Sequence, residues 1–290
     1  ICPMLNLALN GGIPEGSRVL IAGKQGVGKS TYSLEIAKHA IKQDRPVFFL
    51  PIEGRFREQT VTAVSDLNPD DIHIIGSTEN NILYGEDYLS IATQIITDVP
   101  RAVVILDSLS FLYPKSQGDD AVSATNRPSQ PKMISDFLSK VSNIIPVRKS
   151  VLISIAHTYK SQDKYDGETH ITKGGNSSQQ QADIFLRCTS AVDWKEKDEV
   201  IGKLPKWKIL KTAIGAPYSG TVDSYLRFGY GVDDVKENFE LAKEQGLITQ
   251  GGAWHYFNFS DGEKFQGEAK ALAALRENQE VYDKLLNDIL

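Results

Sequence analysis

Cysteine is scarce in this chain. Its 290 residues include only Cys2 and Cys188, and neither belongs to a CxxC pair. Two isolated cysteines offer neither a disulfide framework nor a zinc site, and they fit a reducing compartment such as the cytosol. The chain also lacks any apolar run of the roughly 20 residues that a membrane-spanning helix needs. We therefore expect a cytoplasmic protein with no membrane partner.

Positive charge is in short supply as well. Lysine and arginine number 32 against 37 acidic residues, which gives a net charge of −5. A protein that binds nucleic acid through its phosphates commonly carries a basic excess, so this balance argues weakly against such a partner. The lysines are not spread evenly, however, because several gather at 160–173 and at 203–211. Basic loops on an acidic body are therefore compatible with nucleic-acid binding.

The order of apolar runs and helical patterns predicts the fold class. Short runs rich in β-branched residues alternate with helical periodicity, which is typical of an α/β fold with a mostly parallel central sheet flanked by helices. We expect helices over 30–42 and 88–97. The expected strands cover 19–22, 47–50, 72–75, 103–106, 151–155, 184–186 and 207–210, with a last run around Tyr225.

A change of composition near Gly231 predicts two domains. A core of residues 1–231 would carry the sheet, and residues 232–290 would form a small α/β C-terminal domain. Two polar stretches, 116–131 and 161–181, interrupt the core. Both follow soon after strand ends, where open α/β sheets bind their ligands, and long loops inside a compact domain are usually functional or disordered.

One motif predicts a phosphate site. The run Gly23-Lys24-Gln25-Gly26-Val27-Gly28-Lys29-Ser30 has the GxxxxGK[ST] spacing, with an expected strand before it and a helix after it. Glycines let backbone N–H groups turn inward around a β-phosphate, at the positive N-terminus of the helix. Lys29 would neutralise the β- and γ-phosphates, the Ser30 hydroxyl would ligate Mg²⁺, and Thr31 would follow in the first helical turn. The motif predicts ATP and Mg²⁺ as cofactors.

Three further residues stand just beyond expected strands near this loop. Asp107 ends the run 103–107, where a carboxylate can hold the water shell of Mg²⁺, although an aspartate can also simply begin a surface turn. Glu53 follows the strand 47–50 and is our candidate general base, with a solvated glutamate as the alternative. His157 follows the strand 151–155 and could report the nucleotide state through the γ-phosphate, or could be an ordinary rim histidine.

These residues, in this order, resemble the RecA family of recombinases, and in particular its bacteriophage UvsX-type branch. Five segments of the core carry the resemblance. Residues 5–16 resemble the family's lead-in to the first strand, 48–53 the strand ending in the catalytic glutamate, and 106–109 the Walker B run. Residues 156–159 resemble the phage form of the allosteric switch, and 211–217 resemble a segment that reaches the neighbour's ATP site. The runs at 246–248, 252–256 and 262–267 resemble the C-terminal domain of the bacterial members.

The resemblance implies a DNA-dependent ATPase that forms filaments on single-stranded DNA and catalyses homologous pairing and strand exchange. ATP would lie between protomers. There Glu53 would activate the attacking water, His157 would couple the γ-phosphate to the second DNA loop, and Lys211 would stabilise charge in the adjacent protomer's site. The implied partners are single- and double-stranded DNA, further copies of the chain in a helical filament, and mediator and single-strand-binding proteins, in a bacterial cytoplasm or a phage-infected cell.

The resemblance also places two DNA-binding loops at about 115–132 and 159–176. Backbone amides and lysines in such loops can follow phosphates, and a tyrosine can wedge between bases. Solvated, flexible loops are the alternative. The implied DNA-binding residues are Lys115, Arg127, Lys132, Tyr159, Lys160, Lys164, Tyr165, Lys173, Gly174, Gly175 and Asn176.

Three features depart from the family's pattern. The second of its two trans-acting lysines is Ala213 here, and Arg57 and Thr60 occupy the region of its adenine-stacking tyrosine. The sequence begins at Ile1 and contains no counterpart of the N-terminal helix that docks on the neighbouring subunit, so we expect a segment to precede it.

Two other functions remain open at this stage. A hexameric helicase would share the phosphate loop and the Walker B strand, but the run 252–267 argues against it. A mediator paralogue that binds ATP and hydrolyses little is favoured by Ala213. A kinase using the same loop lacks the signature of a small-substrate pocket.

Overall fold

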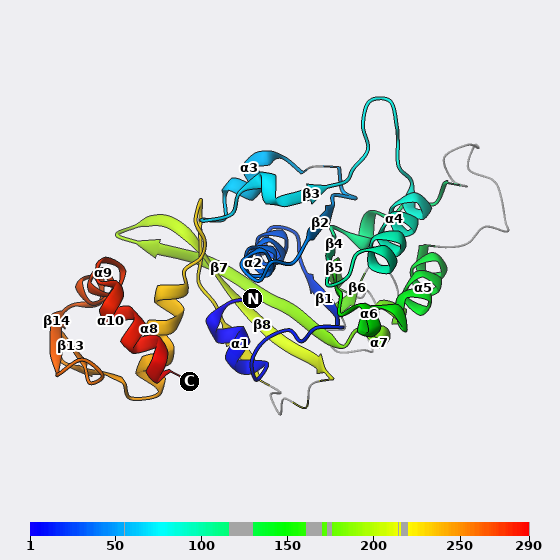
Figure 1. Ribbon diagram of the computed structural model, residues 1–290. Coiled ribbons are helices and arrows are strands. Elements are labelled where there is room, and N and C mark those ends of the chain that lie inside the picture. Colours follow the sequence, from blue (N-terminus) through cyan, green and yellow to red (C-terminus); the bar gives the residue numbers. More distant parts are fainter. Residues whose placement is uncertain are drawn as a thin grey trace.

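The computed structural model describes residues 1–54, 56–115, 130–160, 170–172, 176–213, 215 and 220–289 (Figure 1). Its main feature is a large sheet whose central strands run parallel, in the order β7-β1-β5-β4-β2-β3. These strands are β1 (Arg18–Gly23), β2 (Val47–Leu50), β3 (Ile72–Ile74), β4 (Val103–Leu106), β5 (Val151–Lys160) and β7 (Ile184–Glu196). The expected α/β class with a mostly parallel central sheet is confirmed.

Antiparallel strands extend the sheet beyond β7. The long strand β8 (Glu199–Thr212) pairs with β7, and β10 (Leu226–Arg227) and β11 (Gly231–Val232) follow it outward. Two short strands lie off this path, because β6 (His170–Thr172) pairs with the end of β5 and β9 (Thr221–Asp223) pairs with β8. At the opposite edge lies β3.

Helices cover both faces of the parallel strands (Figure 1). On one face α1 (Pro3–Ala8), α2 (Lys29–Ile41) and α3 (Glu58–Thr62) pack in one hydrophobic cluster, and on the other α4 (Gly85–Asp98), α5 (Gln130–Val141) and α6 (Ile144–Arg148) pack in a second. Successive residues of β4 supply the two clusters in turn, with Ile105 in the first and Leu106 in the second. Burial on both faces explains why these strands read as unbroken apolar runs. Among the described residues before Gly231, the remaining helical elements are α7 (Asn176–Gln181) and short 3₁₀ turns at Pro69–Asp71 and Leu109–Phe111.

The C-terminal part has its own core. Helices α8 (Asp234–Glu244), α9 (Glu268–Glu277) and α10 (Gln279–Asp288) pack on a three-stranded antiparallel sheet of β12 (Ile248–Gly251), β13 (Trp254–Phe257) and β14 (Glu263–Gln266). It is the orange and red part of Figure 1. The two parts also touch, because Met4 of α1 packs on this C-terminal cluster and its backbone N–H donates to Glu237 Oε2 at 3.0 Å. A domain boundary between residues 231 and 232 stays a prediction.

The largest difference from the sequence-based expectation is the β7–β8 hairpin. We expected short strands at 184–186 and 207–210, whereas β7 and β8 run for 13 and 14 residues. Most residues of β7 beyond Cys188 are exposed or only half-buried, so no apolar run marks this part of the strand. Strand β5 likewise continues past Ile155 to Lys160, where pairing with β6 extends it.

The pattern of β13 generates a stability prediction. Phe257 is fully buried in the C-terminal cluster, whereas Trp254 on the same strand is 38% exposed. Phe257→Ala should lower the free energy of unfolding by about 3–5 kcal/mol, because it removes a core ring and leaves a cavity. Urea unfolding followed by circular dichroism would measure this. Trp254→Ala is the matched control and should change stability by less than about half as much; equal losses would contradict this packing.

Candidate nucleotide-binding site

The phosphate loop connects β1 to α2 at the carboxyl edge of the parallel sheet. Strand β1 ends at Gly23 and helix α2 begins at Lys29, with Gly28 as its N-cap in the left-handed region at φ 92°. Gly23 lies tightly against β7, since a Cβ atom there would come within 3.1 Å of Cys188 Cβ. A glycine is therefore needed at both ends of the loop, for close packing at Gly23 and for a positive φ at Gly28.

Lys29 bends back over the loop. Its Nζ donates a hydrogen bond of 2.7 Å to the Lys24 carbonyl and lies 3.5 Å from Nδ1 of His157. Burial lowers the pKa of Lys29 from 10.5 to about 8, while the carboxylates of Asp107 and Glu53 act in the opposite direction. The ammonium group is therefore held in a place where it lacks water and where an additional anion would stabilise it.

Ser30 and Asp107 form the second contact of the site. The Ser30 hydroxyl donates to Asp107 Oδ2 at 2.6 Å, which joins the start of α2 to the end of β4. Burial raises the pKa of Asp107 above its usual value, and the Ser30 hydrogen bond opposes that shift. A hydroxyl and a carboxylate are oxygen ligands of the kind Mg²⁺ prefers, so the pair fits the expected metal. Together with the metal's own waters they would hold Mg²⁺ beside the phosphates.

Glu53 and His157 complete the cluster. The backbone N–H of Glu53 donates to the Asp107 carbonyl at 3.1 Å, and Glu53 Oε2 lies 3.8 Å from Nε2 of His157. His157 sits on β5 directly opposite Gly23 of β1, and its backbone N–H donates to Ser110 Oγ at 2.8 Å. The structure thus brings Lys29, Ser30, Glu53, Asp107 and His157 together. Glu53 and Asp107 follow strand ends as expected, whereas His157 lies within β5, which extends to Lys160.

A cavity of about 340 Å³ lies over the phosphate loop. Besides the loop, Glu53, Asp107 and His157, it is lined by Lys203 of β8 and by Leu226, Arg227, Phe228 and Gly229 in and after β10. Sequence reasoning missed these residues. Strand β10 has only two residues, and no local sequence pattern predicts the pairing with β8 that brings it to the loop.

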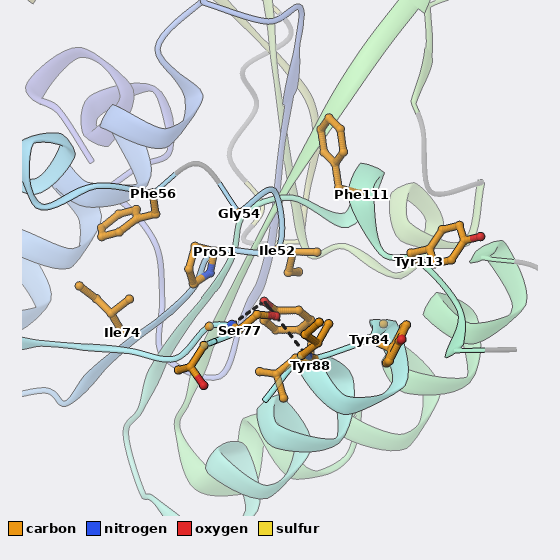
Figure 2. Close-up of a pocket in the computed structure, with 15 residues that line it drawn as sticks. Pro51, Ile52, Gly54, Phe56, Ile74, Ser77, Tyr84, Tyr88, Phe111 and Tyr113 are labelled. Atoms are coloured by element: carbon orange, nitrogen blue, oxygen red, sulfur yellow. Dashed lines mark hydrogen bonds between the residues drawn. The ribbon is translucent and has the colours of Figure 1, made fainter. Parts of the chain in front are cut away.

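A second, larger cavity of about 650 Å³ is lined by residues on either side of Glu53 in the sequence (Figure 2). Pro51, Ile52 and Gly54, which flank the glutamate, line one side of it, and aromatic rings including Tyr84, Tyr88 and Tyr113 line the other. The Ser77 backbone N–H donates a hydrogen bond of 3.3 Å to the Tyr88 hydroxyl. None of the described residues that line this cavity is charged, so it is unsuited to a phosphate and suited to an apolar group.

The expected DNA-binding residues fall partly within the described chain. Lys132 lies in the first turn of α5 rather than in a loop, Tyr159 and Lys160 belong to β5, and Asn176 begins α7. The backbone of Lys115 donates to Glu86 at 2.8 Å, and its Nζ lies 5.9 Å from the centre of the Tyr84 ring. The other predicted positions lie outside the described residues: Arg127, Lys164, Tyr165, Lys173, Gly174 and Gly175.

Lys211 is separate from the cavity of its own chain. It lies near the end of β8 and its Nζ donates to the Gln180 carbonyl at 2.5 Å. It is not among the described residues that line the cavity over the phosphate loop.

A glycine-rich loop between a parallel strand and a helix, on a sheet covered on both faces, defines the class of P-loop α/β proteins. Within that class the chain belongs to the RecA family, since residues 3–233 match the model of the RecA N-terminal domain. It is 28% identical to the RecA protein of Lactococcus lactis subsp. cremoris over 287 residues, which cover 97% of this chain and 72% of that one. It is 27% identical to the RecA protein of Bacteroides thetaiotaomicron over 282 residues, covering 97% and 83% respectively.

The burial of Lys29 generates a pH-dependence prediction. Its folded pKa of about 8 lies below the ordinary value of 10.5, so the unfolded state binds more protons between these values and stability rises with pH across this window. Lys29→Met removes the buried charge. The variant should therefore have a higher free energy of unfolding than the wild type near pH 7. The expected difference is up to a few kcal/mol, because each unit of pKa shift corresponds to ~1.4 kcal/mol, and this difference should shrink by pH 10.

Urea unfolding at pH 7, 8.5 and 10 measures that difference. Lys24→Met is the matched control, because Lys24 belongs to the same loop but its side chain is exposed. It should leave the pH dependence of stability unchanged. A constant stability difference between Lys29→Met and the wild type across this range would contradict the burial of the ammonium group.

Proposed function

We propose that this protein is an ATP-dependent DNA recombinase, which forms filaments on single-stranded DNA and catalyses homologous pairing and strand exchange. The observation that carries the proposal is the convergence of Lys29, Ser30, Glu53, Asp107 and His157 on one cavity. This set contains a phosphate-binding cation, a pair of magnesium ligands and a carboxylate suited to activate water. Membership of the RecA family supports the DNA-directed part of the proposal.

The chemistry follows from the placement of each group. The loop N–H groups and the Lys29 ammonium bind the β- and γ-phosphates, and Ser30 with Asp107 holds Mg²⁺, which supplies further positive charge there when bound. Glu53 lies beside the γ-phosphate end of the cavity, where its carboxylate accepts a proton from the attacking water. Its backbone N–H bond to Asp107 ties the base to the metal ligand, so their spacing is set by the pairing of β2 with β4.

His157 is suited to couple nucleotide state to DNA. It lies 3.5 Å from Lys29 and 3.8 Å from Glu53, so its ring meets both the cation and the base. The same strand continues through Tyr159 to Lys160, where the proposed second DNA loop begins. A shift of His157 toward a γ-phosphate would therefore be passed along β5 to the DNA-binding segment.

Assembly into a filament has support at the opposite edge of the sheet. Strand β3 is an edge strand, and its Ile74 is 43% exposed and lines the uncharged cavity beside Glu53. An open strand edge next to an apolar cavity is suited to receive a segment of a second copy. In such an assembly, Lys211 of one copy would stabilise charge at the nucleotide bound to the neighbouring copy. We further propose a UvsX-type relationship, a cytoplasmic setting, and mediator and single-strand-binding proteins as partners.

A weakly hydrolysing mediator is the second candidate. Ala213 stands where the family pattern has a second lysine, and it is an exposed residue after β8. Loss of that charge would slow hydrolysis without removing nucleotide binding. A ring-forming helicase would differ from both by unwinding a duplex without exchanging strands.

Hydrolysis with and without single-stranded DNA tests the proposal. The wild type should be strongly stimulated by DNA. Glu53→Gln should lower kcat by about 10²–10⁴-fold, because the base is lost, while ATP binding stays within a few-fold. Glu58→Gln is the matched control, since Glu58 is an exposed glutamate in the first turn of α3. ATP binding without stimulated hydrolysis in the wild type would reject the recombinase and favour the mediator.

The position of Lys132 allows a test of the first DNA segment. Lys132→Ala should weaken single-stranded DNA binding and reduce the magnitude of the slope of log K against log salt by about 0.7, as expected for one lost phosphate contact. Fluorescence anisotropy at several salt concentrations measures both. Lys140→Ala, at the other end of α5 and also exposed, should leave the slope unchanged. The same slope for Lys132→Ala as for the wild type would remove this residue from the interface.

A further inference from the structure

A second lysine faces the nucleotide cavity from the side opposite the phosphate loop. Lys203 of β8 lies directly across from Leu226 of β10, and paired residues on neighbouring strands carry their side chains on the same face. Leu226 lies against the loop, since a Cβ atom on Gly28 would come within 2.8 Å of Leu226 Cδ2. Both residues line the cavity. Lys203 thus approaches the site close to the N-cap of α2.

The neighbouring Arg227 also lines the cavity, but its guanidinium is engaged by other groups. It pairs with Gly202, and its guanidinium lies 5.0 Å from the centre of the Trp194 ring. The same group makes ion pairs of 3.2 Å with Glu196 and 3.2 Å with Asp233. Because two carboxylates and an aromatic ring engage the Arg227 guanidinium, Lys203 is the cation of β8 and β10 that is more readily available to a nucleotide.

Lys203 forms an ion pair with Asp193 that it can exchange for a contact with a phosphate. Its Nζ lies 2.6 Å from Asp193 Oδ1, and the two side chains are 31% and 47% exposed. An ion pair this open to water contributes little to stability. A phosphate that enters the cavity also carries negative charge and forms strong charge-assisted hydrogen bonds with an ammonium group. The aspartate therefore keeps the lysine extended along the sheet without preventing its transfer to a phosphate.

Groups from two different parts of the sheet line the cavity. Glu53 and His157, which the proposed function places at the γ-phosphate, come from the region after β2 and from β5. Lys203 and Leu226 come from β8 and β10, where Leu226 lies beside Gly28 and where Phe228, which is 56% exposed and available to stack on a base, also lines the cavity. We propose that Lys203 binds the α-phosphate of a nucleotide held by the phosphate loop of the same chain. This inference rests on the proposed ATP site and adds a binding residue to it.

Binding of ADP and ATP to the full chain tests the assignment. Lys203→Met should weaken both nucleotides by about tenfold or more, as expected when a hydrogen bond between an ammonium and a phosphate is lost. Lys203→Arg keeps the charge and should restore most of the affinity. In steady-state hydrolysis Lys203→Met should raise KM while kcat stays within about twofold, because a contact to the α-phosphate is unchanged between ground and transition state.

Lys206→Met is the matched control. Lys206 lies three residues further along β8, is 45% exposed and makes an ion pair of 3.4 Å with Asp223, but it does not line the cavity. This variant should bind both nucleotides as the wild type does. Circular dichroism and thermal unfolding of each variant would establish that the hairpin remains folded, so that an affinity change reports on the contact.

The outcomes separate this inference from the proposed function. Wild-type affinity of Lys203→Met for ADP and ATP would overturn the inference and leave the ATP site intact. A loss for ATP alone would also overturn it, because the contact would then be to the γ-phosphate. A wild-type protein that binds neither nucleotide would reject the ATP site and this inference together.

Discussion

The site depends on four parallel strands ending at one edge of the sheet. Glu53, Asp107 and the phosphate loop follow β2, β4 and β1, and His157 lies within β5 opposite the end of β1, so these residues are far apart in the sequence and are brought together by strand pairing. Pairing in parallel register places His157 opposite Gly23, and the backbone bond from Glu53 to Asp107 joins two strand ends at 3.1 Å. A change of register by one residue in any of these strands would turn its functional side chain to the other face.

The phosphate-loop helix is also fixed at its sides by buried polar contacts with later parts of the chain. The Tyr32 hydroxyl donates to Ser224 Oγ, and Ser224 in turn donates to the Glu237 carboxyl of α8. One turn away, the backbone N–H of Val232 donates to Glu35 Oε1 at 2.8 Å. Burial raises the pKa of Glu237 to about 7. Such buried polar groups tolerate few alternative arrangements, so they specify how α2 and α8 pack together.

The sequence predicts the parts of this protein whose physical requirements are local. Strands buried on both faces read as apolar runs, and β2 and β4 were predicted to the residue. The phosphate loop can be recognised in the sequence because its glycine, lysine and serine residues must occur at fixed spacing. Residues that face the loop from β8 and β10 escaped prediction, because an exposed hairpin has no apolar pattern and because long-range pairing decides which of its residues meets the cavity. The proposed DNA-binding segment at about 115–132 includes the first residues of α5, which begins at Gln130.

Charge balance explains how an acidic chain can hold a polyphosphate. Before a nucleotide enters, the Lys29 ammonium is the buried cation of the cluster, and burial has already lowered its pKa to about 8. The carboxylates of Glu53 and Asp107 compensate only part of its lost hydration, since the net shift is still downward. A phosphate beside Lys29 supplies the missing counter-charge and draws the equilibrium toward the ammonium form. At the proposed ATP site, nucleotide binding and protonation of Lys29 would therefore reinforce each other, and the unfavourable burial of this lysine in the free protein would become a favourable contact in the complex. A preference for an anion would then follow from that exchange rather than from the net charge of the chain.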